Sequence, residues 1–189
     1  MSALTAPGAL ASRAATAGLS APAGWALVKG GNSTSPSTLI PGVYPLRFLA
    51  EGYYAVAELG YAYPGNDKGM LRTRSMTIGP WEQFYFIWDS GTSSWLLFSI
   101  GASSYVTTEL GYAYPGNDRG MLRARSTAIG PWEQFELLFS SGSGTYALRS
   151  KANGMYVTTE LGYAYPGNDR GMLRARSTTI GPWEQFQLN

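Results

Sequence analysis

The chain of 189 residues contains no cysteine and no histidine. Without cysteine it has neither disulfide bonds nor thiolate metal sites, although the cellular compartment stays undecided. Without histidine it lacks the side chain that serves most often as a general base and as a metal ligand. Charged residues make up only 14% of the chain, and the net charge is +2. No segment concentrates basic residues, so we expect no nucleic-acid partner.

Long apolar runs are also missing. No stretch approaches the roughly 20 apolar residues of a membrane-spanning helix, so we predict no membrane span. Residues 1–24 lack a basic start followed by an apolar core, so they do not resemble a secretion signal. The localisation stays open between an extracellular place and the surface of a particle. The chain does contain 24 glycines, 11 prolines and 14% aromatic residues, which is typical of a turn-rich β protein.

An internal repeat organises most of the chain. The segment ELGYAYPGND occurs three times at intervals of 51 residues, and a GPWEQF segment follows each copy in the same register. Such a period indicates a repeat architecture. The sequence just upstream of each copy differs, so either the conserved stretch meets a demand that the rest does not, or local gene conversion has kept it uniform.

Each repeat contains four expected strands, separated by turn residues. In the third copy we predict them at 146–150, 156–160, 173–177 and 183–188. The alternation in the third of these strands places Leu173 and Ala175 inward, with Arg174 and Arg176 outward. Helical periodicity is absent.

Three repeats of four strands predict an all-β β-trefoil of twelve short strands, over residues 44–189. A solenoid would need distinct capping repeats, and a propeller normally needs at least four blades. Closure into a trefoil leaves no exposed edge. The expected repeats are 44–94, 95–145 and 146–189. Residues 1–43 are expected to form an extended N-terminal arm of low complexity, with a short strand at 25–31 and a loop at 32–38.

The third copy also carries a family resemblance. Its ALRSKANGMYVTTE and LRARSTTIGPWEQFQL segments resemble the fascin-like branch of β-trefoils, and the resemblance covers residues 44–189. It implies one of two roles: fascins bundle actin with four trefoils in series, whereas single trefoils resemble lectins and carbohydrate-binding modules. One trefoil departs from the bundling pattern. The segment LGYAYPGNDRGM departs from the shorter glycine-rich link of the family, and there we expect the specificity.

The chemistry of this repeated segment suits sugar recognition. A tyrosine face covers the C–H patch of a pyranose, while Asp, Asn and Arg bind hydroxyl groups. Alternatively, one tyrosine per copy packs on the barrel, and Glu109 or Asp118 pairs with Arg123 or Arg125. The candidate carbohydrate-binding residues are Glu58, Tyr61, Tyr63, Asn66, Asp67 and Trp81; Glu109, Tyr112, Tyr114, Asn117, Asp118 and Trp132; and Glu160, Tyr163, Tyr165, Asn168, Asp169 and Trp183.

The tryptophan of each GPWEQF segment allows two interpretations. It either seals the end of the barrel or forms the floor of a shallow sugar site, for Trp132 beside Glu109 or Glu133. These two glutamates could in principle form a glycosidase pair, but three near-identical active sites on one small barrel would be unusual. We therefore predict no enzyme. One Asp and one Asn per loop fall short of the six to eight oxygens around calcium, so neither a metal nor a cofactor is predicted.

The sequence thus predicts multivalent carbohydrate binding by a lectin or carbohydrate-binding module, with glycans or a polysaccharide as partner and one shallow site per repeat. The alternative is a structural or decoration subunit of a larger assembly such as a virion, anchored through residues 1–43 and displaying the trefoil. Both roles can coexist.

Overall fold

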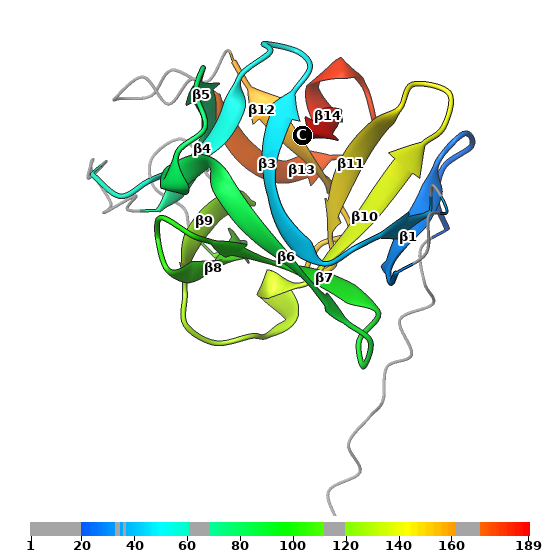
Figure 1. Ribbon diagram of the computed structural model, residues 1–189, viewed down its shortest axis with the longest axis horizontal. Coiled ribbons are helices and arrows are strands. Elements are labelled where there is room, and N and C mark those ends of the chain that lie inside the picture. The colour runs from blue at the N-terminus through cyan, green and yellow to red at the C-terminus, as the bar shows by residue number, and fades with distance from the viewer. Residues whose placement is uncertain (1–19, 33–34, 36, 61–68, 112–119, 162–170) are drawn as a thin grey trace, which may run out of the picture.

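The computed structural model describes residues 20–32, 35, 37–60, 69–111, 120–161 and 171–189. They form a β-trefoil whose barrel is a closed ring of six strands (Figure 1). In ring order these are β3 (Gly42–Phe48), β6 (Gln83–Asp89), β7 (Ser94–Ser99), β10 (Phe135–Ser140), β11 (Thr145–Ser150) and β14 (Phe186–Leu188). Each strand pairs with the next, and β14 pairs with β3 to close the ring.

The other six trefoil strands form three hairpins that cap one end of the barrel. They are β4 (Tyr54–Glu58) with β5 (Met70–Ser75), β8 (Ser104–Glu109) with β9 (Met121–Ser126), and β12 (Tyr156–Glu160) with β13 (Met172–Ser177). The hairpins join one another through β5, β9 and β13. At their centre lie Met70, Met121 and Met172, which are fully buried and form one cluster. The twelve predicted trefoil strands are therefore present.

Apolar side chains at equivalent positions of the repeats fill the barrel. Phe84, Phe135 and Phe186 come from the same strand of each repeat, and all are fully buried. Burial of such a side chain contributes about 1.5–3 kcal/mol to folding. The alternation along the barrel strands produces this core, as the sequence pattern predicts.

The fourth strand of each repeat begins later than the sequence suggests. A 3₁₀ turn, η3 (Pro182–Glu184), stands in place of the start of the strand predicted at 183–188. The equivalent turns η1 (Pro80–Glu82) and η2 (Pro131–Glu133) precede the fourth strands of the other two repeats. Proline presets the backbone for the first position of such a turn. The carboxylate of Glu184 then accepts a hydrogen bond from the Gly181 N–H at 2.7 Å, which holds the turn closed.

The N-terminal arm lies against the trefoil. The predicted strand at 25–31 is present as β1 (Ala26–Gly30), which runs antiparallel along the outer side of β10 (Figure 1). A further strand, β2 (Thr38–Leu39), pairs parallel with β1 and was not predicted. The Trp95 indole N–H donates to the Val28 carbonyl at 2.9 Å, and Val28 is buried.

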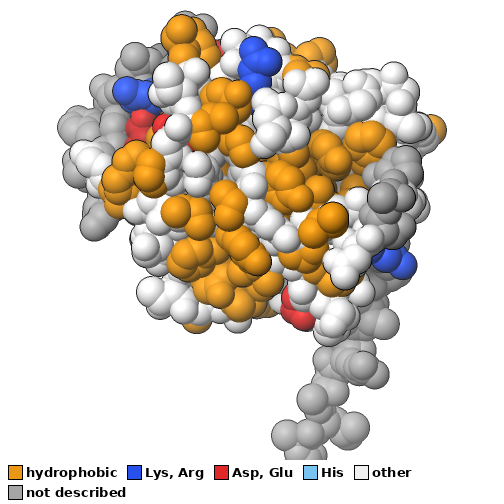
Figure 2. Space-filling view, in the orientation of Figure 1, with side chains coloured by type: hydrophobic (Ala, Val, Ile, Leu, Met, Phe, Trp, Pro, Cys, Tyr) orange, Lys and Arg blue, Asp and Glu red, His pale blue; other side chains and the backbone are white. Residues whose placement is uncertain are grey.

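The face in Figure 2 carries apolar side chains gathered over β6 and β7. Val43, Tyr85, Phe98 and Tyr105 stand opposite one another in register across four neighbouring strands. Val43 and Tyr85 are exposed, and the rings of Phe98 and Tyr105 meet edge to face at 5.1 Å.

Within the ranges given above, no helix has the length and apolar character needed to cross a membrane.

Candidate functional site

A groove lies beside each capping hairpin, so the trefoil carries three equivalent grooves. Each is lined by the end of the first hairpin strand, by an arginine of the second hairpin strand and by the tryptophan of the 3₁₀ turn that follows. The volumes are about 450, 950 and 480 Å³ in the first, second and third repeats. The lining residues that all three share are Glu58, Leu59, Arg74 and Trp81; Glu109, Leu110, Arg125 and Trp132; and Glu160, Leu161, Arg176 and Trp183.

The groove glutamates hold two arginines each. Glu109 Oε2 lies 3.1 Å from Arg123 Nη1, and Glu109 Oε1 lies 2.5 Å from Arg125 Nε. Glu58 and Glu160 form the same pairs in the other repeats, with Arg72, Arg74, Arg174 and Arg176. The ion pairing raised as an alternative for Glu109 is therefore present. Both oxygens of each carboxylate contact a guanidinium group. The groove surface that a ligand can reach is therefore formed mainly by other side chains.

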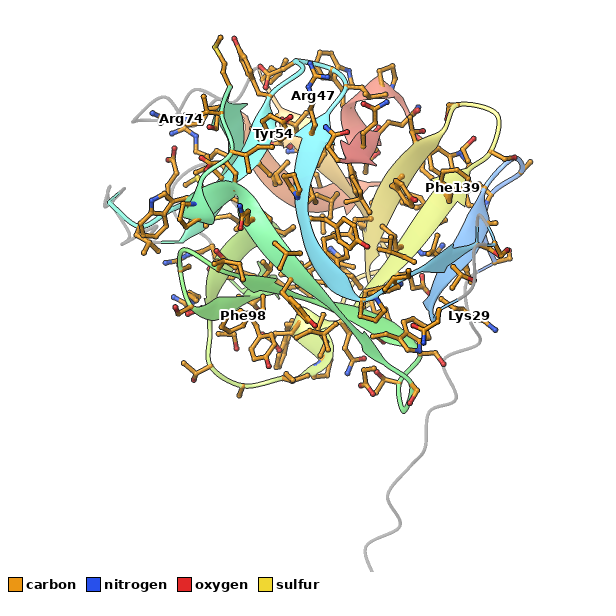
Figure 3. All side chains as sticks on the ribbon, viewed as in Figure 1. Lys29, Arg47, Tyr54, Arg74, Phe98 and Phe139 are labelled. Carbon is orange, nitrogen blue, oxygen red and sulfur yellow. The ribbon has the colours of Figure 1, made fainter. Side chains whose placement is uncertain are left out.

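The two arginines of each pair differ in exposure. The Arg174 side chain is 3% exposed, whereas that of Arg176 is 54% exposed. The prediction that Arg174 points to solvent is wrong, because β13 pairs with β9 at this position and Arg174 stands opposite Met121 of the neighbouring repeat. Leu173 and Ala175 are buried, as predicted. Figure 3 shows the equivalent exposed arginine of the first repeat, Arg74 of β5, at the outside of the molecule.

These exposed arginines line the grooves, and the sequence pattern did not predict them as candidate site residues. A signal for them was present, since two arginines two positions apart follow a glutamate in all three copies. The register places Glu109 opposite Met121. Met121 precedes Arg123 by two positions and Arg125 by four. The alternation of side chains along one strand predicts that both arginines face solvent. It does not take into account the neighbouring hairpin, which buries the first arginine.

The groove tryptophans stand at the surface. Trp81, Trp132 and Trp183 are 42%, 52% and 45% exposed, so they do not belong to the buried core. Phenylalanines fill that interior instead. Trp81 is nevertheless held on one side, because a Cβ atom added to Gly101 would lie 2.3 Å from its ring. An indole fixed on one side and exposed on the other offers a flat apolar surface to a ligand.

The glutamate that follows each tryptophan has a structural contact. Glu133 Oε2 accepts a hydrogen bond from the Gly130 N–H at 2.7 Å, and Glu133 is 5% exposed. Its equivalents Glu82 and Glu184 accept the same bond from their own glycines. The conserved glutamate of GPWEQF thus closes the 3₁₀ turn that presents the tryptophan.

The predicted loop residues lie outside the described residues. They are Tyr61, Tyr63, Asn66 and Asp67; Tyr112, Tyr114, Asn117 and Asp118; and Tyr163, Tyr165, Asn168 and Asp169. The described residues that flank the second loop are fixed at the groove, because the Gly120 N–H donates to the Glu109 carbonyl at 2.7 Å. Leu110 and Gly111 line the same groove.

The grooves differ in detail. Thr107 and Thr108 line the second groove, and Thr158 and Thr159 line the third, whereas the first has Val56 and Ala57 at these positions. The first groove therefore lacks two hydroxyl groups that the others contain.

Comparison with known proteins places the fold. No family model matches the chain, and no curated protein matches it in sequence. The designed three-fold symmetric protein ThreeFoil is similar at 20% identity, over 78% of this chain and 97% of its own, with a TM-score of 0.59. A ricin B-like lectin of Macrolepiota procera, solved with lactose, is similar at 13% identity over 80% and 97%, with a TM-score of 0.56.

A third similar structure is larger. It is a GlcNAcα1-4Gal-releasing endo-β-galactosidase from Clostridium perfringens, at 14% identity and a TM-score of 0.55. The match covers 80% of this chain but only 32% of that enzyme. At these identities the likeness shows the β-trefoil fold.

Proposed function

We propose that the protein binds carbohydrate at three shallow sites, one in each groove, as a multivalent lectin or carbohydrate-binding module. The observation that carries the proposal is the half-exposed tryptophan at the same place in all three repeats. Exposed indoles are costly in water, and an aromatic face suits the C–H patch of a pyranose. The tyrosine, asparagine and aspartate residues of the repeated segment, which lie outside the described residues, would supply hydroxyl-binding groups.

Several further features support this function. The grooves are open and shallow, as a site for part of a polymer requires. A single site would bind weakly, at about 4 kcal/mol or near millimolar affinity. Three sites on one polymer would raise the avidity by roughly 10²–10⁴. Among similar trefoils, one is a lectin solved with lactose and another belongs to a galactosidase, which supports the proposal by analogy of fold only.

We also infer that the chain is a single-trefoil member of the fascin-like branch. The GPWEQF close that suggested this resemblance adopts the same 3₁₀ turn in all three repeats. We expect no catalysis, because Glu109 is held by two arginines and Glu133 by a backbone N–H.

The alternative function, a subunit of a larger assembly, would use the arm as an anchor. β1 and β2 pack on the protein's own trefoil. An anchoring role would therefore fall mainly to the residues before Ser20, which lie outside the described part of the chain.

A glycan array and a polysaccharide pull-down with the full chain test the proposed function. The variant W81A/W132A/W183A should lose binding while its circular dichroism stays that of a folded β protein. The control I78A/I129A removes two apolar side chains of similar exposure, 46% and 49%, just before the turns, and should bind normally. Unchanged binding by the triple variant would exclude the grooves as the sugar sites.

A further inference from the structure

We propose that the three grooves select acidic glycans, and that the half-exposed arginine of each groove binds the acidic group. These residues are Arg74, Arg125 and Arg176. This inference rests on the carbohydrate-binding function proposed above and names its ligand class. The chemistry recognised is a carboxylate of a uronic acid or a sulfate ester, since both present oxygens in the geometry of a guanidinium fork.

The first argument is charge. Each groove glutamate faces two guanidinium groups, and the buried one alone would balance it. Arg123 is the buried partner of Glu109, with a side chain only 2% exposed. A buried charge needs such a partner, whereas Arg125, at 55% exposed, does not need one. The second arginine is therefore an exposed cation at the rim of the groove that the charge balance of the glutamate does not require, and it recurs in all three repeats.

The second argument is which charged groups a ligand can reach. The charged residues that line the second groove, among those described, are Glu109, Arg123, Arg125 and Glu133. Both glutamates and Arg123 are engaged and at most slightly exposed. Arg125 is the remaining one. Neutral sugars need acceptors for their hydroxyl protons, and of the described carboxylates in this groove Glu109 is held by two arginines and Glu133 by a backbone N–H.

The third argument is orientation. A guanidinium group has five N–H donors, and the glutamate contacts that of Arg74 through Nη1 and that of Arg125 through Nε. Donors therefore remain for a ligand, while the contact restrains the side chain before binding. Restraint of this kind lowers the entropy cost of a two-pronged contact. The tryptophan in the same groove would cover the sugar ring that carries the acidic group.

The experiment compares polymers that differ only in charge. The full chain is titrated with polygalacturonate and with its fully methyl-esterified form, and separately with dextran sulfate and dextran, at about 0.15 M salt where long-range attraction is screened. We expect at least about tenfold tighter binding of one acidic polymer than of its neutral counterpart. The pair that shows the difference identifies the carboxylate or the sulfate as the ligand.

Variants assign the effect to the grooves. The variant R74Q/R125Q/R176Q should bind the acidic polymer about tenfold or more weakly than the unmodified protein. The variant R74K/R125K/R176K should lie between the two, because lysine keeps the charge but cannot form the two-pronged contact. The control K29Q/R47Q removes two positive charges outside the grooves and should change affinity less than about twofold. Equal loss in this control would show unspecific attraction and overturn the proposal.

The two proposals fail differently. Equal binding of esterified and free polymer, lost in W81A/W132A/W183A, would refute acidic selectivity and leave carbohydrate binding intact. If the folded protein binds none of the four polymers and no glycan on the array, carbohydrate binding itself is wrong.

Discussion

The three repeats make the same contacts at the capping end of the trefoil but different contacts at the corner covered by the arm. At the capping end, the glycines, methionines, glutamates and arginines of the three hairpins make the same contacts three times. At the arm corner the repeats diverge: Trp88 and Trp95 meet at 5.2 Å where the next repeat has Phe139 and Tyr146 at 4.9 Å. β1 contacts the tryptophan pair through Gly30 and Val28, and it meets the other pair through Ala26, which stands opposite Phe139.

This comparison changes how the sequence identity of the repeats is to be interpreted. Much of the conserved stretch meets packing demands at the threefold axis, and these demands require no ligand. The half-exposed tryptophans and the outer arginines are different, because the barrel core does not contain them and each groove glutamate already has a buried arginine partner. They, rather than identity alone, carry the case for a binding surface.

The largest effect should distinguish the two arginines of one groove. Arg123→Met removes the buried partner of Glu109 and should lower the free energy of unfolding by about 3–5 kcal/mol. Arg125→Gln removes the exposed partner and should cost less than about 1 kcal/mol. Urea unfolding followed by tryptophan fluorescence measures both. Equal losses would show that the outer arginine is also structural, which would weaken its assignment to a ligand.

The glycine before each central methionine should come next. Gly120 has φ +86°, and a Cβ atom there would lie 2.5 Å from the Ala175 carbonyl oxygen. Gly120→Ala should therefore cost about 2–4 kcal/mol in unfolding free energy. Gly111→Ala is the matched control, since no atom of the described residues lies within 4 Å of its added Cβ, and it should change stability by less than about 0.5 kcal/mol. A tolerated Gly120→Ala would mean that the hairpins can move apart.

The fold could be predicted from the sequence because a 51-residue period and strand alternation leave few closed architectures. The wrong predictions concern positions whose structure depends on contacts that strand alternation does not include. Arg174 is buried by the adjacent hairpin, and the start of the predicted strand at 183–188 is bent into η3 by Pro182 and the Glu184 contact. The repeated sequence also indicated the tryptophans and glutamates that line the grooves, whereas the outer arginines needed the register between strands.

At the arm corner, Gly30→Ala should have a smaller and more local effect. Its Cβ would lie 2.2 Å from the Trp88 side chain, so β1 should be displaced at a cost of about 1–3 kcal/mol. Hydrogen exchange should show lost protection in β1, with the capping hairpins unchanged. Gly31→Ala, whose nearest neighbour is the Thr38 methyl group at 3.3 Å, should be milder. Lost protection in the hairpins too would show that the arm supports the whole trefoil.

The smallest effect should come from a position where the capping end departs from its own symmetry. The Thr73 and Thr159 hydroxyls meet at 2.5 Å across two repeats. Thr108, the equivalent of Thr159, has a buried hydroxyl with no hydrogen-bond partner among the residues that the structure describes, and Ala175 occupies the position that corresponds to Thr73. Ala175→Thr should supply the missing partner and stabilise the protein by about 0.5–1.5 kcal/mol, whereas Thr73→Ala should destabilise it by a similar amount. Opposite signs in urea unfolding would show that the hydrogen bond decides the outcome. If Ala175→Thr destabilises instead, the space around Ala175 is tighter than around Thr73, and the hairpins are less equivalent than their backbone pairing indicates.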